Sequence, residues 1–138
     1  MNLRRASRAL LSLLVMTLLF ACKPSAGSDA LHGTKWSLSA IDGVPPLPGE
    51  PLTLTFQDGQ VRGWSGCNSY SGTYAVRGEV LAIGELMATA MACVEPGRME
   101  QESAFLARLG AVTAFGQAEG RLDLTADEGQ SLMFVPQS

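Results

Sequence analysis

Three cysteines and one histidine are the residues of this chain whose types suggest chemistry beyond packing. Cys67 and Cys93 stand 26 positions apart in the middle of the chain, and Cys22 lies near its N-terminus. A structural zinc site takes four Cys or His ligands, usually in closely spaced pairs. His32 is the only histidine and no Cys-x-x-Cys pair is present, so we expect no metal and no cofactor.

The pair Cys67 and Cys93 has two interpretations. In an oxidising compartment a lone pair of cysteines at this spacing is typical of a disulfide. The alternative is two buried free thiols, since free cysteine behaves as a small apolar side chain. Export of the chain favours the disulfide.

The first 21 residues predict an export signal. Arg4, Arg5 and Arg8 precede an apolar run from Ala9 to Phe20. This run of 12 residues is much shorter than the roughly 20 that cross a bilayer, as is usual for a secretory signal peptide. We therefore expect residues 1–21 to be removed from the mature chain.

Residues 19–22 resemble the bacterial lipobox, which implies that Cys22 receives acyl chains, palmitate among them, and becomes the new N-terminus. The alternative is an ordinary secretory signal with an incidental cysteine. Residue 23 is Lys and not Asp, the residue linked with inner-membrane retention. By that analogy we expect an outer membrane lipoprotein that faces the periplasm. Residues 22–30 then form the lipidated cysteine and a flexible tether, because they are small and polar.

Charge limits the partners of the mature chain. Removal of the signal leaves seven of the ten basic residues against 13 acidic ones, a net charge of about −6. An acidic chain without a basic patch is not expected to bind nucleic acid, or anionic lipid by charge alone. The membrane contact is therefore expected from the acyl chains on Cys22.

Residues 31–138 predict one domain of mostly antiparallel β structure. Apolar residues alternate with polar ones, or gather in short runs bounded by turns, in several segments. We expect strands over residues 34–41, 52–56, 61–65, 73–76, 80–83, 122–124 and 132–135. Helical spacing of apolar residues appears only over residues 98–112. The expected fold class is α+β, with a compact curled sheet or partial barrel and one helix packed against it.

The turn-rich segment around Cys67 offers the best candidate binding residues, Trp64, Asn68 and Tyr70. Aromatic side chains provide amphipathic contact area, and Asn tolerates turn geometry. The alternative is that Asn68 closes the turn while the aromatic side chains pack in the core. The proline-rich loop, residues 43–51, is likewise either a rigid connector or a recognition edge.

Two motifs give the chain a resemblance to the META/HslJ-like domain family. The first is made of Gly66, Cys67, Asn68, Tyr70, Gly72 and Tyr74, and the second of Thr89, Met91, Ala92 and Cys93. The resemblance covers nearly all of residues 31–136 and implies a compact β-rich fold. It also implies a heat-inducible or stress-associated envelope protein, often a lipoprotein, without established catalytic activity. Ala90 departs from the charged or polar residue found in many relatives.

The expected function is that of a non-enzymatic envelope lipoprotein that supports heat or antibiotic tolerance by binding an envelope protein or a small apolar ligand. The alternative is a secretion-accessory or inhibitor-like module that binds lipid or peptide. An enzyme is disfavoured, and we expect no catalytic residues, because residues 63–66 lack the Gly-x-Ser-x-Gly elbow by one residue. An apolar interior cavity would favour lipid binding, and a filled core would favour protein binding.

Overall fold

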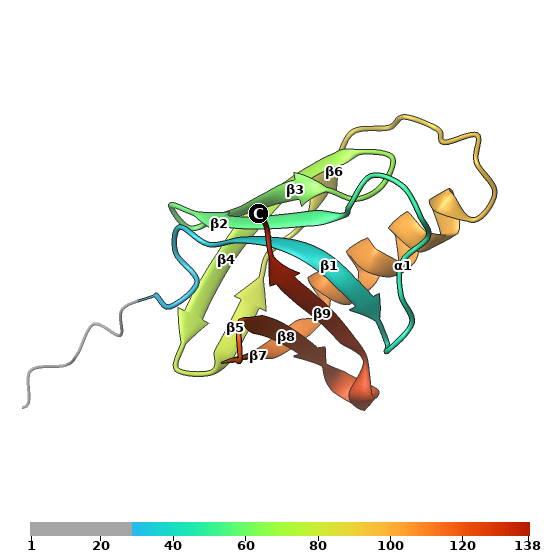
Figure 1. The fold of residues 1–138 in the computed structure, drawn as a ribbon. Coiled ribbons are helices and arrows are strands. Elements are labelled where there is room, and N and C mark those ends of the chain that lie inside the picture. The colour runs from blue at the N-terminus through green and yellow to red at the C-terminus, as the bar shows by residue number, and fades with distance from the viewer. Residues whose placement is uncertain (1–28) are drawn as a thin grey trace, which may run out of the picture.

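The computed structural model describes residues 29–138 (Figure 1). The signal peptide, Cys22 and the tether up to residue 28 lie outside the described residues. The described elements are β1 (Lys35–Ile41), β2 (Thr53–Gln57), β3 (Gln60–Trp64), β4 (Ser69–Arg77), β5 (Val80–Ile83), β6 (Met87–Ala88), α1 (Arg98–Gly110), β7 (Val112–Ala118), β8 (Arg121–Ala126), a 3₁₀ turn (Asp127–Gly129) and β9 (Ser131–Pro136).

Eight of the strands close into an antiparallel barrel. The pairs run β1–β2–β3–β4–β5–β7–β8–β9, and β9 pairs back with β1. The short strand β6 lies outside this ring, beside the first residues of β4. Closure gives each barrel strand a neighbouring strand on both sides. The predicted fold class is confirmed, with the sheet closed completely.

Side chains fill the barrel interior. In β1 and β2 every second residue is buried, as expected for strands with one face toward a core. The rings of Tyr70, Phe105 and Phe134 form two edge-to-face contacts across the interior, with centroids 5.6 and 6.4 Å apart. The fully buried large side chains are Phe56, Phe105, Phe134, Leu31, Leu52, Leu54, Leu81, Leu109, Leu122, Leu124, Leu132 and Val61.

Helix α1 covers one end of the barrel, at the right in Figure 1. It begins after Gly97, whose φ of 81° is a conformation that glycine adopts without a steric penalty. Glu102, Phe105 and Leu109 are its buried residues, and their spacing places them on one face of the helix. Phe105 reaches from this face into the core between Tyr70 and Phe134.

A turn before β1 lies on the side of the barrel away from α1 (Figure 1). Leu31 is fully buried there, and its amide donates a hydrogen bond of 3.0 Å to the Asp29 carboxylate. The Tyr74 hydroxyl donates to the same carboxylate. Burial, together with this carboxylate, raises the pKa of Tyr74 above its ordinary range. Asp29 and Ala30, expected from sequence to lie in the tether, therefore belong to the folded domain.

The start of β4 and strand β7 differ from the sequence-based expectation, and the short strand β6 was not predicted either. Residues 69–72 lie in the turn-rich segment that was expected to precede the strand at 73–76, but they begin β4. They pair with β3 on one side, and residues 70 and 71 pair with β6 on the other. Val112 was expected to end the helix but begins β7, a strand that was not predicted. The sequence of β7 does not alternate clearly, and six residue pairs with β8 hold it in place.

Replacing Phe105 by Ala tests the role of α1 as the cover of the barrel. We expect Phe105→Ala to lower the free energy of unfolding by about 3–5 kcal/mol, because a fully buried ring leaves a cavity. The matched control is Ser103→Ala on the exposed face of the same helix, with an expected change within about 0.5 kcal/mol. Urea unfolding curves measure both. Equal small losses would show that the helix does not complete the core.

Candidate binding site

A buried carboxylate joins α1 to the turn after β3. Glu102 is only 6% exposed, and its carboxylate accepts three hydrogen bonds from that turn. The donors are the Ser65 hydroxyl at 2.5 Å, the Cys67 amide at 3.1 Å and the Asn68 side-chain amide at 2.7 Å. A buried carboxylate is costly unless such donors replace its water, so this contact fixes the turn against the helix.

Asn68 extends the network to the loop that follows β6. Its Nδ2 donates to the Met91 carbonyl at 3.0 Å as well as to Glu102. Its Oδ1 accepts from the Met91 amide at 2.7 Å and from the Thr89 hydroxyl at 2.8 Å. A side-chain amide has two N–H donors and two acceptor lone pairs, and all four are used here. Asn68 thus binds both polar groups of the Met91 backbone.

A disulfide fixes the same loop at a second point. Cys67 and Cys93 are joined, with their Cα atoms 5.6 Å apart, as the sequence predicted. Residues 89–97, between β6 and α1, are named here the pinned loop. Asn68 holds this loop at Met91, and the disulfide holds it two residues further on.

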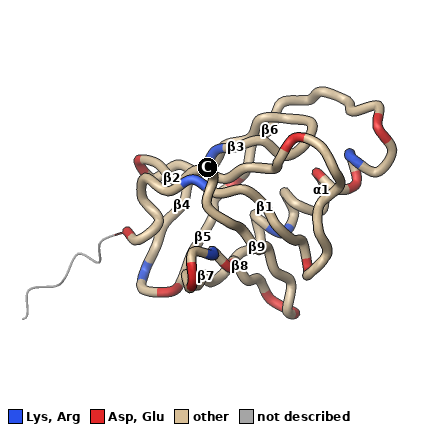
Figure 2. The backbone as a smooth tube through the Cα atoms, in the orientation of Figure 1, with Lys and Arg blue, Asp and Glu red and all other residues tan. Residues whose placement is uncertain are grey.

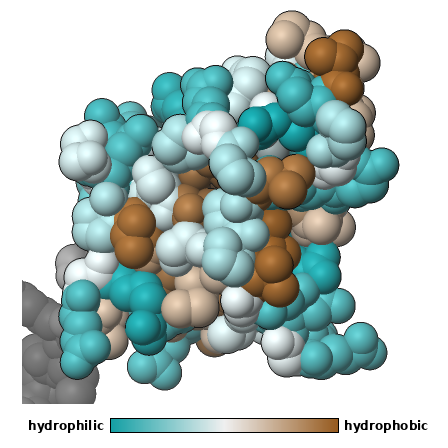
Figure 3. Space-filling model, turned by 45° about the vertical axis from the view of Figure 1, so that its right-hand side comes forward, coloured by the Kyte–Doolittle hydropathy of each residue, from teal (hydrophilic) through white to brown (hydrophobic). Residues whose placement is uncertain are grey.

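The pinned loop and β6 expose apolar side chains. Met87 is 71% exposed, Met91 is 61% exposed and Val94 is 93% exposed. No charged residue occurs between Glu85 and Glu95. Figure 3 shows hydrophobic side chains at the upper right of the molecule, the region where this loop runs in Figure 1. Apolar side chains gathered on a surface often mark a contact with a partner.

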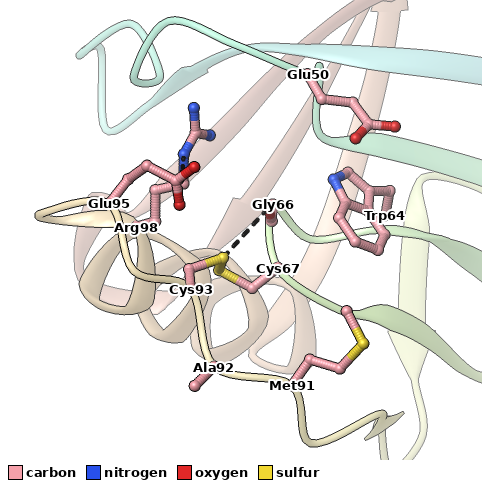
Figure 4. Close-up of a pocket in the computed structure, with 9 residues that line it drawn as sticks. All are labelled: Glu50, Trp64, Gly66, Cys67, Met91, Ala92, Cys93, Glu95 and Arg98. Atoms are coloured by element: carbon pink, nitrogen blue, oxygen red, sulfur yellow. Dashed lines mark hydrogen bonds and ion pairs between the residues drawn. A yellow bond between two sulfur atoms is a disulfide. The ribbon is translucent and has the colours of Figure 1, made fainter.

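A cavity of about 330 Å³ opens beside the disulfide (Figure 4). Trp64 at the end of β3 lines it, together with the two cysteines and Met91 of the pinned loop. Charged side chains also line the cavity, and they are Glu50, Glu95 and Arg98. The Trp64 indole N–H is buried and has no hydrogen-bond partner among the described residues.

The predicted binding residues separate into two groups. Trp64 is partly exposed and lines the cavity, whereas Asn68 and Tyr70 are both only 3% exposed. The Tyr70 hydroxyl donates to the Thr53 carbonyl at 2.7 Å, and burial raises its pKa. The prediction that all three form a surface patch is therefore wrong for Asn68 and Tyr70. For these two residues the structure matches the alternative of turn closure and core packing.

Sequence reasoning missed Glu102 and the exposed side chains of the pinned loop. A signal for each is present in the sequence. Glu102 shares the apolar helix face with Phe105 and Leu109, at spacings of three and seven residues, where a charge is unusual. Residues 86–94 form an uncharged, mostly apolar run that follows neither the helical nor the strand period.

The proline-rich loop is docked on α1. The Leu47 amide donates to the Gln101 side chain at 2.6 Å, and the Arg108 guanidinium pairs with Asp42 at 2.5 Å. A shallow apolar cavity of about 410 Å³ lies between this loop and the helix. These contacts fit the rigid connector that was one of the two interpretations of residues 43–51.

Two further findings apply to residues 29–138. Within this range no helix is both long and apolar enough to cross a membrane. Over the same range, no three His, Cys, Asp or Glu side chains gather in a way that would hold a metal ion.

The fold and the site define a small closed β-barrel that carries a helix over one end and a disulfide-linked loop beside that helix. The model of the META domain family matches residues 29–138, and the chain belongs to this family. The comparison with curated proteins finds no match.

Two solved structures have a similar fold. An NMR structure of a protein from Burkholderia xenovorans is 33% identical, with a TM-score of 0.67, over 78% of this chain and 84% of that one. A crystal structure of a DUF4847 family protein from Bacteroides vulgatus has a TM-score of 0.54 and 15% identity, over 79% of this chain and 97% of that one. The second likeness shows the fold alone.

Replacing Asn68 by Ala tests the buried network. We expect Asn68→Ala to lower the free energy of unfolding by at least about 2 kcal/mol, because the buried Glu102 carboxylate loses a donor and Met91 loses both partners. Ser71→Ala in the adjacent strand β4 is the control, with little change expected. Urea unfolding measures both variants. A loss for Asn68→Ala as small as that of the control would contradict the network's role.

Mass spectrometry after alkylation tests the disulfide. Without reductant, Cys67 and Cys93 should take up no alkylating reagent, and with reductant both should. Loss of a crosslink that closes a loop of this length should remove about 3–4 kcal/mol of stability, and so lower the melting temperature by at least about 10 °C. Two alkylated thiols in the non-reduced protein would overturn the assignment.

Proposed function

We propose that this chain is a non-enzymatic envelope lipoprotein whose pinned loop and adjacent β6 bind an envelope protein. One observation carries the proposal. The disulfide and a fully satisfied buried network hold in place a surface loop whose Met91 and Val94 side chains are exposed. Burying these apolar side chains would stabilise the fold more than exposing them does, so their exposure is not explained by stability alone.

Rigidity and side-chain type both suit this loop to binding. Holding a loop in its bound conformation before the partner arrives removes part of the entropy cost of association. Methionine side chains are flexible and polarisable, so they adapt to irregular apolar surfaces. The pinned loop combines a fixed backbone at Met91 with an adaptable side chain at the same residue.

The groups that catalysis would need are engaged in structural contacts. The Ser65 hydroxyl and the Glu102 carboxylate lie 2.5 Å apart, and both residues are buried. His32 lies in the turn before β1, on the opposite side of the barrel from α1. This arrangement supports a binding role in preference to a reaction.

The filled barrel interior supports a protein partner over a lipid held inside the barrel. Phe56, Phe105 and Phe134 are fully buried there. The alternative of a lipid-binding accessory or inhibitor-like module would need space that these rings occupy. Peptide binding by such a module remains compatible with the exposed loop, which makes it a variant of the same proposal.

The entry point of the chain and the pinned loop lie on opposite sides of the barrel. If Cys22 carries the acyl chains, the seven residues from it to Asp29 span at most about 25 Å when extended. The chain enters the barrel on the side away from α1 (Figure 1), so the pinned loop would face away from the outer membrane into the periplasm. Membership of the META family, together with the stress association that the resemblance implied, suggests that the bound partner serves heat or antibiotic tolerance.

Two matched valine variants test the contact surface. Native mass spectrometry of the protein purified from its own envelope should show a retained protein partner. We expect Val94→Asp in the pinned loop to weaken that complex at least about tenfold, because it places a charge in an apolar contact. Val80→Asp in β5, where the side chain is 57% exposed on the barrel wall, should leave it unchanged. An unchanged complex for Val94→Asp, or no retained protein, would contradict the proposal.

Labelling with palmitate tests the anchor. The wild-type chain should incorporate the label and fractionate with the outer membrane on a density gradient. Cys22→Ser should incorporate none, because the acyl acceptor thiol is gone. A wild-type chain without label would refute the lipoprotein assignment and leave the binding proposal to be judged separately.

A further inference from the structure

We infer that the cavity beside the disulfide receives a basic side chain, lysine or arginine, from the partner polypeptide. This inference rests on the proposed function, because it assigns the chemistry by which the partner is recognised. It is carried by the charges and the apolar walls of this one cavity.

The cavity has an apolar centre between charged sides. Figure 4 shows Glu50 and Trp64 on one side, Arg98 and Glu95 on the other, and the disulfide between them. Met91 rises from the pinned loop below Trp64 (Figure 4). A long side chain that entered here would lie along sulfur and aromatic surface.

The positive charge of Arg98 is already paired within the domain, so it does not set the net charge of the cavity. Its Nη2 donates to the Pro48 carbonyl at 2.6 Å, and its Nε lies 4.0 Å from the Glu95 carboxylate. Only 15% of the Arg98 side chain is exposed. Glu50, in contrast, has no hydrogen bond or ion pair among the described residues. The uncompensated charge of the cavity is therefore the carboxylate of Glu50.

The same arginine holds Glu50 in place. Gly49 has a φ of 137°, and a Cβ added there would lie 2.2 Å from Arg98 Nη2. The guanidinium therefore packs directly on the backbone that precedes Glu50. Proline at 48 and at 51 further limits the conformations of this segment. The contact with Arg98 and the two prolines therefore restrict the backbone that positions Glu50.

A basic side chain matches each part of the site. Its alkyl stem suits the surface formed by Trp64, Met91 and the disulfide, and its cationic end suits the indole ring and the Glu50 carboxylate. Residues 29–138 carry 13 acidic and six basic residues, which Figure 2 marks along the backbone, so the domain's electrostatic field also favours a basic partner.

NMR titration of the isotope-labelled mature protein in detergent micelles tests the inference. The chain has only two tryptophans, so the indole N–H signals report on Trp64 and on Trp36. The Trp36 indole is buried away from the cavity and donates to the Thr34 hydroxyl at 2.8 Å, which makes it the internal control. The probes are the N-acetyl methylamides of lysine, norleucine and glutamate, each at up to about 10 mM to detect millimolar dissociation constants.

The lysine probe should shift the Trp64 signal, leave the Trp36 signal in place and bind more tightly than the norleucine and glutamate probes. Glu50→Gln should weaken lysine binding about two- to fivefold, whereas Glu79→Gln, in the β4–β5 turn at the other end of the barrel, should not. Equal binding of norleucine, preferred binding of glutamate or no shift with any probe would overturn the inference. A partner that is retained in native mass spectrometry despite such a result would leave the pinned-loop proposal standing.

Discussion

The carboxylate of Glu102 is the contact on which the organisation of the site depends. It lies on the buried face of α1, yet its hydrogen-bond donors all come from the turn between β3 and β4. Without those donors, the free-energy cost of burying a charged carboxylate would oppose the packing of α1 over the end of the barrel. With them, the helix that completes the core also fixes the turn that carries Cys67 and Asn68. The hydrogen bonds of Glu102 therefore contribute both to the stability of the barrel and to the geometry of the site.

The entry point of the chain and the candidate binding site lie on opposite sides of the barrel. One side of the barrel receives the chain at Asp29, where Leu31 and Tyr74 fix the entry point. The other carries α1, the pinned loop and the cavity beside the disulfide. This separation suits the proposed lipoprotein, because an anchor that precedes Asp29 and the proposed contact surface would not compete for the same face of the domain.

Much of the fold could be predicted from sequence because the signals were local. Alternation in residues 35–41 and 53–57, and the Asp58–Gly59 turn, depend only on near neighbours. Strand β7 and the start of β4 are set by pairing with distant strands, which no local pattern reveals. The site divides in the same way. The Cys67–Cys93 disulfide could be predicted because only these two cysteines remain once Cys22 is set aside for acylation. The burial of Asn68 and Tyr70 depends on contacts with Glu102 and Thr53, which only the folded chain brings close to them.

Amide hydrogen exchange at Met91 tests most directly whether the buried network holds the exposed loop. The Met91 N–H donates to the Asn68 side chain, whereas the Met91 side chain is 61% exposed. Exposure alone would give fast exchange, but a pinned backbone gives slow exchange because the loop must open first. We expect the Met91 amide to exchange at least about a hundredfold more slowly than an unstructured peptide, which corresponds to an opening free energy of about 2.7 kcal/mol, and we expect Asn68→Ala to abolish that protection. Exchange at the unstructured rate in the wild type would contradict the account, because the loop would then not be held for binding.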